Sequence, residues 1–172
     1  MAKSRRKIDA IKLLKQDHKE VDGLFKEFEK LDEAGEDAVE QVIATACTEL
    51  EIHDKIETEI FYPAVRQQAE QEEVEDLLDE AEVEHTTVRD LIKKIKGMGA
   101  GDKKRNAHFT VLMEYVKHHV KEEEKEMFPK VKQLGLDFGQ LGRQMQDRKD
   151  ELMAEMGIDV DALEEERQGE TA

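Results

Sequence analysis

The sequence contains few of the residues that favour a disulfide-linked, β-rich or membrane-spanning protein. Of its 172 residues one is cysteine, two are proline and none is tryptophan, and aromatic residues make up 5%. The single cysteine, Cys47, excludes an internal disulfide and favours a reducing compartment. No apolar run approaches the roughly 20 residues of a membrane-spanning helix, and no apolar segment follows the basic residues near the start. We therefore predict a cytoplasmic protein with no membrane partner.

Charge is what the sequence has in abundance. Charged residues make up 41% of the chain, and the formal net charge is −16. A composition rich in Glu, Lys, Leu and Ala favours helices over sheet. The negative charge argues against nucleic acid as a partner, because phosphate groups would be repelled. It suits a protein that handles cations, although a solvated acidic surface is the simpler explanation of the charge alone.

Apolar residues recur at helical spacing in four segments. The breaks between these segments fall at residues 33–37 (EAGED), 67–71 (QQAEQ) and 97–101 (GMGAG). Clustered glycines stop a helix at the last of them. Short connections imply antiparallel neighbours, so we predict an all-α, up-down-up-down four-helix bundle over residues 1–135.

Residues 136–172 are predicted to form an additional C-terminal helix and an acidic tail. The apolar positions of the helix are Leu141, Met145, Leu152 and Met156, and no ligand-type pattern accompanies them. We expect this helix to pack against the bundle or to form a dimer contact, so the protein could be a monomer or a dimer. The tail EEERQGETA has the composition of a disordered segment.

The four apolar stripes are interrupted by ionisable residues in a shared register. The interruptions are one histidine on each helix and, on two helices, a glutamate four residues later: His18, His53, Glu57, His85, His119 and Glu123. Residues four apart lie on one helix face, with Cβ atoms about 5–6 Å apart, and so are close enough to ligate neighbouring ions.

The interrupted stripes form an internal duplication. The stretch DHKEVDGLF around His18 matches EHTTVRDLI around His85, and HDKIETEIFYP matches HVKEEEKEMFP 66 residues later. Each half is therefore predicted to be one helix hairpin. Pro63 and Pro129 occupy equivalent places, where each either kinks its helix or ends it.

Six inward ionisable groups at related positions indicate a metal site. A buried carboxylate without a partner is costly, and the stripes contain no arginine or lysine to compensate for it. Divalent cations would supply the missing charge, and the repeat offers two equivalent half-sites for two ions. Imidazole and carboxylate donors suit iron, manganese or zinc, whereas calcium and magnesium prefer oxygen ligands alone.

On these motifs the chain resembles the hemerythrin-like, HHE cation-binding family. The match is the pattern His, His-x-x-x-Glu, His, His-x-x-x-Glu between His18 and Glu123. The resemblance implies a non-haem di-iron centre inside a four-helix bundle. His18 and His53 would hold one iron, and His85 and His119 the other. Glu57 and Glu123 would bridge them, with an oxo or hydroxo group completing the bridge.

The sequence departs from the oxygen-carrying members of the family at two positions. Those proteins have a further histidine where this chain has Arg89. They also have an aspartate five residues after the last histidine, where this chain has Glu124, and repeat symmetry favours Glu123 as the ligand. One iron would therefore have fewer nitrogen ligands, which makes reversible oxygen carriage less certain.

Four other polar residues lie near the motifs. Asp54 could add a terminal carboxylate, but we expect it to be a solvated surface residue. Tyr115, one turn before His119, could contact the centre, but we expect it to pack in the core. His108 and His118 are expected to be exposed.

The predicted function is a non-haem di-iron protein that binds oxygen or related small molecules, namely peroxide and nitric oxide, for sensing, detoxification or carriage. Two histidines and two shared carboxylates give each iron about four protein ligands. An open position would remain even beside an oxo bridge. The alternatives are an iron-handling or iron-sensing protein and a weak peroxide- or NO-consuming enzyme, so the sequence leaves enzymatic activity open. Zinc or manganese could replace iron.

Overall fold

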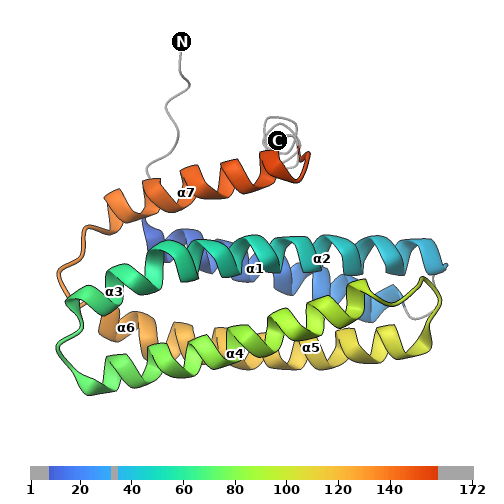
Figure 1. Ribbon diagram of the computed structural model, residues 1–172, viewed down its shortest axis with the longest axis horizontal. Helices are drawn as coiled ribbons and strands as arrows, with labels where there is room; N and C mark the ends of the chain where they lie inside the picture. The colour runs from blue at the N-terminus through green and yellow to red at the C-terminus, as the bar shows by residue number, and fades with distance from the viewer. Residues whose placement is uncertain (1–7, 32–34, 159–172) are drawn as a thin grey trace, which may run out of the picture.

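The computed structural model describes residues 8–31 and 35–158, and their regular structure is entirely helical. The four longest of these helices are followed by α7 (Figure 1). Their bounds are α1 Ala10–Lys30, α2 Glu36–Ile56, α4 Glu72–Lys96, α5 Lys103–Glu122 and α7 Phe138–Glu155. The predicted all-α class is confirmed. Within the described ranges, no helix has the length and apolar character needed to cross a membrane.

Local sequence signals set the ends of these helices. Asp9, Asp102 and Asp137 stand at the N-caps of α1, α5 and α7, and each side chain accepts a hydrogen bond from a backbone N–H two or three residues later. Such caps satisfy donors that the first helical turn leaves unpaired. The helix α4 ends at Gly97, and the chain turns through Gly101 at φ 79°. The predicted breaks at 67–71 and 97–101 are confirmed; that at 33–37 lies partly outside the described residues.

A π-helical turn interrupts each of the two helices that carry a glutamate of the motif. The helix α2 continues into the π-helix η2 (Glu57–Phe61) and then α3 (Tyr62–Gln68). The helix α5 continues into η3 (Glu123–Met127) and then α6 (Phe128–Val131). Pro63 and Pro129 lie at the starts of α3 and α6, so neither proline ends its helix. Proline lacks an N–H and its ring displaces a carbonyl of the preceding turn, and the wider π-helical turn accommodates both effects.

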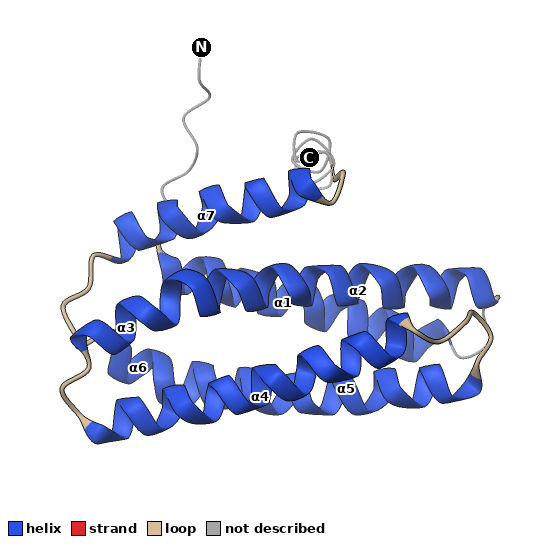
Figure 2. Ribbon diagram, viewed as in Figure 1, coloured by secondary structure: helices blue, strands red, loops and turns tan. Residues whose placement is uncertain are grey.

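The long helices pack as a bundle (Figure 2). The helix α1 contacts α2 and α5, and α4 contacts α5 and α2. Two apolar clusters form the core: one contains Phe61, Phe128 and Leu14, and the other contains Phe25 and Phe109. Along every long helix, the ionisable positions fall between residues of these two clusters. The candidate site is therefore enclosed by apolar side chains at both ends.

The helix α7 lies on the face of the bundle formed by α1 and α2, away from α4 and α5 (Figure 1). Leu141, Met145 and Leu152 are buried as predicted, whereas Met156 is exposed. Packing against the bundle is thus the alternative that the structure supports. The division at residue 135 into two domains stays a prediction, and the acidic tail lies outside the described residues.

Candidate metal centre

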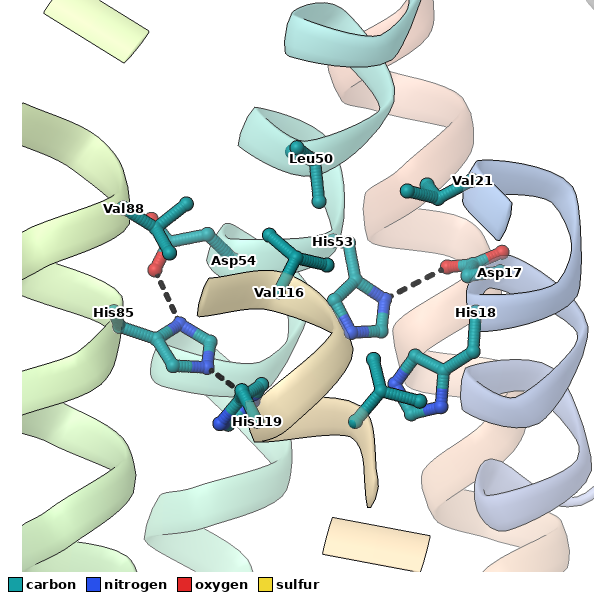
Figure 3. Close-up of a pocket in the computed structure, with 11 residues that line it drawn as sticks. Asp17, His18, Val21, Leu50, His53, Asp54, His85, Val88, Val116 and His119 are labelled. Carbon is teal, nitrogen blue, oxygen red and sulfur yellow. Dashed lines mark hydrogen bonds and ion pairs between the residues drawn. The ribbon is translucent and has the colours of Figure 1, made fainter. Parts of the chain in front are cut away.

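The structure brings all six predicted side chains into one buried cluster. They come from different elements: His18 from α1, His53 from α2, Glu57 from η2, His85 from α4, His119 from α5 and Glu123 from η3. No residue of the six is more than 8% exposed. Figure 3 shows the four imidazoles facing one another. The sequence therefore identified residues that lie together, and their role as metal ligands stays a prediction.

The donor atoms form two overlapping groups. One contains His18, His53, Glu57 and Glu123, and the other contains Glu57, His85 and His119; within each group the atoms lie within 4.8 Å of one another. The two oxygens of Glu57 face different histidines, since Oε1 lies 3.1 Å from Nε2 of His53 and Oε2 lies 3.1 Å from Nε2 of His85. Oε2 of Glu123 lies 3.1 Å from Nε2 of His18 and 3.8 Å from Nε2 of His119. Each carboxylate therefore joins histidines of both halves.

At each of the four histidines of the cluster, a further carboxylate contacts Nδ1, the ring nitrogen that faces away from the centre. The Nδ1 contacts are His18 with Glu124 at 2.8 Å, His53 with Asp17 at 3.2 Å, His85 with Asp54 at 2.7 Å, and His119 with Glu84 at 2.6 Å. Such a contact places a proton on Nδ1 and directs Nε2 toward the centre, an arrangement found around metal-bound histidines. Only the folded arrangement reveals these four partners, because each comes from a different helix than its histidine.

Two expectations about neighbouring residues are wrong. Asp54 is not a solvated surface residue, because its side chain is only 13% exposed and its Oδ1 accepts from both His85 and Arg89. Tyr115 is not in the core, because it is 45% exposed. Arg89 is half exposed and pairs with Asp54 at 2.7 Å, so its guanidinium lies outside the centre. His118 is exposed, as predicted.

Charges inside the cluster offset the cost of burial. Burial alone would raise the pKa of Glu57, but His53 and His85 hold it well below its usual range. Burial alone would lower the pKa of His53, but Glu57 and Asp17 raise it well above its usual range. The same balance, set by Asp54 and Glu57, raises the pKa of His85 to about 9. In the metal-free protein, protonated imidazoles therefore supply the positive charge that a metal ion would replace.

Four inward atoms of the cluster face one another in two ion pairs at 3.1 Å, but in the described part of the chain none of them has a partner with hydrogen-bond geometry. They are Nε2 of His18, Nε2 of His53, Oε1 of Glu57 and Oε2 of Glu123. Buried polar atoms normally find a partner, and those that do not need an explanation. Converging nitrogen and oxygen lone pairs suit a borderline transition-metal ion. The residues present thus fit a cation at this place.

Tyr62 is a site residue that the sequence analysis missed. Its hydroxyl lies 2.9 Å from Oε1 of Glu123, 3.2 Å from Oε2 of Glu57 and 3.1 Å from Nε2 of His85. In an α-helix, a residue five positions after Glu57 would face away from it. The π-helical turn, in which the N–H of Tyr62 bonds to the carbonyl of Glu57, brings the two onto one face. The available sequence signal was the proline that follows Tyr62.

A small apolar cavity adjoins the imidazoles on the side away from Tyr62. Its volume is about 30 Å³, and its apolar lining includes Val21, Leu50, Val88 and Val116 (Figure 3). A larger surface groove of about 220 Å³ between α1 and α5 shares His18, Val21 and Val116 with this cavity. The groove therefore lies next to the cavity and reaches His18 from the surface of the bundle.

A helical bundle that encloses a set of histidines and glutamates of this kind defines a cation-binding protein. The family model for the hemerythrin HHE cation-binding domain matches residues 9–131. The chain belongs to this family, and the resemblance drawn from its motifs is confirmed. No curated protein and no solved structure gave a significant match.

Proposed function

We propose that this chain is a non-haem di-iron protein that binds oxygen or a related small molecule, peroxide or nitric oxide. The six ligands in this proposal are His18, His53, Glu57, His85, His119 and Glu123. Zinc or manganese could use the same donors, because both accept imidazole and carboxylate. The partners would be small molecules, with neither nucleic acid nor membrane involved.

The observation that carries the proposal is the position of Glu57. Its two oxygens face His53 and His85, each at 3.1 Å, and these histidines belong to different donor groups. A single ion would need all four imidazoles directed at one point. Two groups of donors that share one carboxylate instead support two ions bridged by that carboxylate.

A pair of iron ions, when bound, would supply Lewis acidity and electrons to a small molecule. The protein would position the ligands and supply a hydrogen-bond donor. The four outer carboxylates orient the imidazoles, and the hydroxyl of Tyr62 can donate a hydrogen bond to either glutamate. Val21, Leu50, Val88 and Val116 keep the imidazole side apolar.

The size and lining of the cavity support a small, weakly polar ligand. A volume of about 30 Å³ admits a molecule about as large as water, a size class that includes oxygen, nitric oxide and peroxide. The apolar walls offer few hydrogen bonds, which favours oxygen and nitric oxide over more strongly solvated molecules.

Iron handling or iron sensing is a second candidate function. It is favoured by the burial of six ionisable groups whose charges a bound cation would balance. Ions that bind only the folded state stabilise it, so the stability of the bundle would rise with the concentration of available iron. A weak peroxide- or NO-consuming activity is compatible with the same centre, since Tyr62 places a hydrogen-bond donor beside both glutamates.

We further propose an up-down-up-down bundle built from two equivalent hairpins. The contacts of α1 with α2 and of α4 with α5 support this pairing. The π-helical turns at Glu57–Phe61 and Glu123–Met127 support the equivalence, because each begins at a glutamate of the motif and is followed at once by a helix that carries a proline.

Anaerobic loading with ferrous iron tests the proposal. The purified protein should bind about two iron ions per chain, and mixing with oxygen, peroxide or nitric oxide should change its visible spectrum. Glu57→Ala should lose iron, whereas Glu126→Ala, which removes an exposed carboxylate from the other π-helical turn, should retain it. A wild-type protein that binds no iron, or equal iron in both variants, would contradict the proposal.

A further inference from the structure

The helix α7 lies outside the residues 9–131 that the family model matches, yet it reaches the candidate centre. Its Lys149 is buried, and the ammonium group donates to Oδ1 of Asp17. The other oxygen of Asp17, Oδ2, lies 3.2 Å from Nδ1 of His53. A chain of polar contacts therefore runs from α7 through α1 to a histidine of the centre on α2.

Asp17 differs from the other three carboxylates that hold a histidine. Its side chain is 5% exposed, whereas those of Asp54, Glu84 and Glu124 are 13%, 19% and 34% exposed. Water can compensate the charges of the more exposed carboxylates in part. Asp17 has little access to water, so two buried partners compensate its charge, the ammonium of Lys149 and the imidazole of His53.

The neighbour of Lys149 also contacts an element that carries a ligand. Nε of Arg148 lies 2.7 Å from Oε2 of Glu59, which belongs to the same π-helical turn as Glu57. Near its start, α7 approaches the backbone of α1 so closely that no side chain fits at Gly142. Both features fix α7 against α1 and η2, so the position of Lys149 relative to Asp17 is determined by packing.

We propose that Lys149 is a positioning residue of the metal centre, which acts through Asp17 to orient the imidazole of His53. This inference rests on the proposed function, because it treats His53 as a metal ligand. The ammonium holds the carboxylate of Asp17 in place through Oδ1, and Oδ2 of the same carboxylate accepts from Nδ1 of His53. Nε2 is thereby directed at the cation site before any ion binds. The C-terminal helix is accordingly part of the centre.

Two measurements on the full chain test this role. In the metal-free protein, the Nδ1–H signal of His53 in nitrogen–proton NMR should shift or broaden in Lys149→Met. In anaerobic competition titrations with ferrous iron, Lys149→Met should bind about tenfold more weakly or worse, as for other residues that orient metal ligands. Lys149→Arg keeps the cation and should restore most of the affinity.

Met145→Ala is the matched control. Met145 is fully buried on the same helix but offers Asp17 no charge, so this variant should lose stability while its iron affinity stays at the wild-type value. Should Lys149→Met fail to fold, Asp17→Asn/Lys149→Met removes both charges together and leaves neither of them unpaired. That double variant should also bind iron more weakly than the wild type.

Wild-type iron affinity in Lys149→Met or in the double variant would overturn the inference. So would an equal loss of affinity in Met145→Ala, because the effect would then reflect the packing of α7 alone. A wild-type protein without iron affinity would instead contradict the proposed function. The NMR comparison needs no metal and would still show whether Lys149 orients His53.

Discussion

At the residue scale, one difference between the two halves of the centre is a hydroxyl group. Tyr62 and Phe128 occupy equivalent positions, each five residues after a glutamate of the motif. The hydroxyl of Tyr62 enters the cluster, whereas the ring of Phe128 lies parallel to that of His18, with centroids 6.1 Å apart. The chemistry available to the two candidate ions is therefore asymmetric although the motifs repeat.

Tyr62→Phe should destabilise the metal-free protein. The substitution removes a donor from the buried carboxylates of Glu57 and Glu123, and leaving such groups unsatisfied costs about 1–3 kcal/mol. Chemical denaturation measures the change. Tyr115→Phe is the control, because that hydroxyl belongs to an exposed side chain and its loss should leave stability unchanged. Equal effects of the two variants would show that the hydroxyl of Tyr62 makes no net contribution.

The contribution of His85 to stability should depend on pH. Its pKa in the folded, metal-free protein is about 9, above the ordinary value of 6.5, so folding favours the protonated form. This stabilisation is complete below about pH 6.5 and disappears as the pH rises through about 9. The difference in unfolding free energy between wild type and His85→Gln should therefore shrink between about pH 6 and pH 10. A constant difference would contradict the raised pKa.

At the element scale, the π-helical turns and α7 decide which side chains reach the centre. Each π-helical turn begins at a glutamate of the motif, and the first brings Tyr62 onto the face of Glu57. The helix α7 adds Lys149 from outside the matched domain. The surroundings of the six predicted residues thus depend in part on α7, which carries none of them.

Gly142→Ala should loosen α7. A Cβ atom at this position would clash with the carbonyl of Ile8 and would lie 2.8 Å from the backbone nitrogen of Ala10. We expect a loss of about 1–3 kcal/mol, as for other overpacked sites, and faster amide hydrogen exchange in α7. In the control Gly139→Ala, the atom nearest to the new Cβ would be 3.4 Å away, so no clash is expected. Alanine has a higher helix propensity than glycine, so this variant should have unchanged or slightly higher stability. Equal exchange rates in the two variants would contradict the close approach.

At the scale of the whole molecule, the bundle places a compact set of ionisable groups between two apolar clusters. The chain carries a net charge of −16, so the surface repels anions while the interior collects cation ligands. Metal occupancy and folding should therefore be linked, because ions held by groups from four helices bind only the folded state.

Removing metal should lower the melting temperature of the protein. Ferrous iron at about 100 times its dissociation constant would stabilise the fold by about 2.7 kcal/mol. Thermal unfolding followed by circular dichroism, with and without anaerobic iron, measures the shift. Magnesium is the control, because it prefers oxygen ligands alone and should leave the melting temperature unchanged. A magnesium effect equal to that of iron would indicate non-specific charge screening.

The sequence by itself determined the all-α class, two of the breaks between helices and the six residues that lie together in the core. Helical periodicity makes such features readable, because residues four apart share a face whatever the helix packs against. The partner of each imidazole was decided only by tertiary structure, as Asp54 shows: it follows His53 in the chain but holds His85 on another helix. The contact of Tyr62 with Glu57 depends on a π-helical turn, and Lys149 donates to Asp17, which lies 132 residues earlier in the chain. Such contacts are determined by how the helices pack against one another, and the spacing of residues along the sequence does not specify that packing.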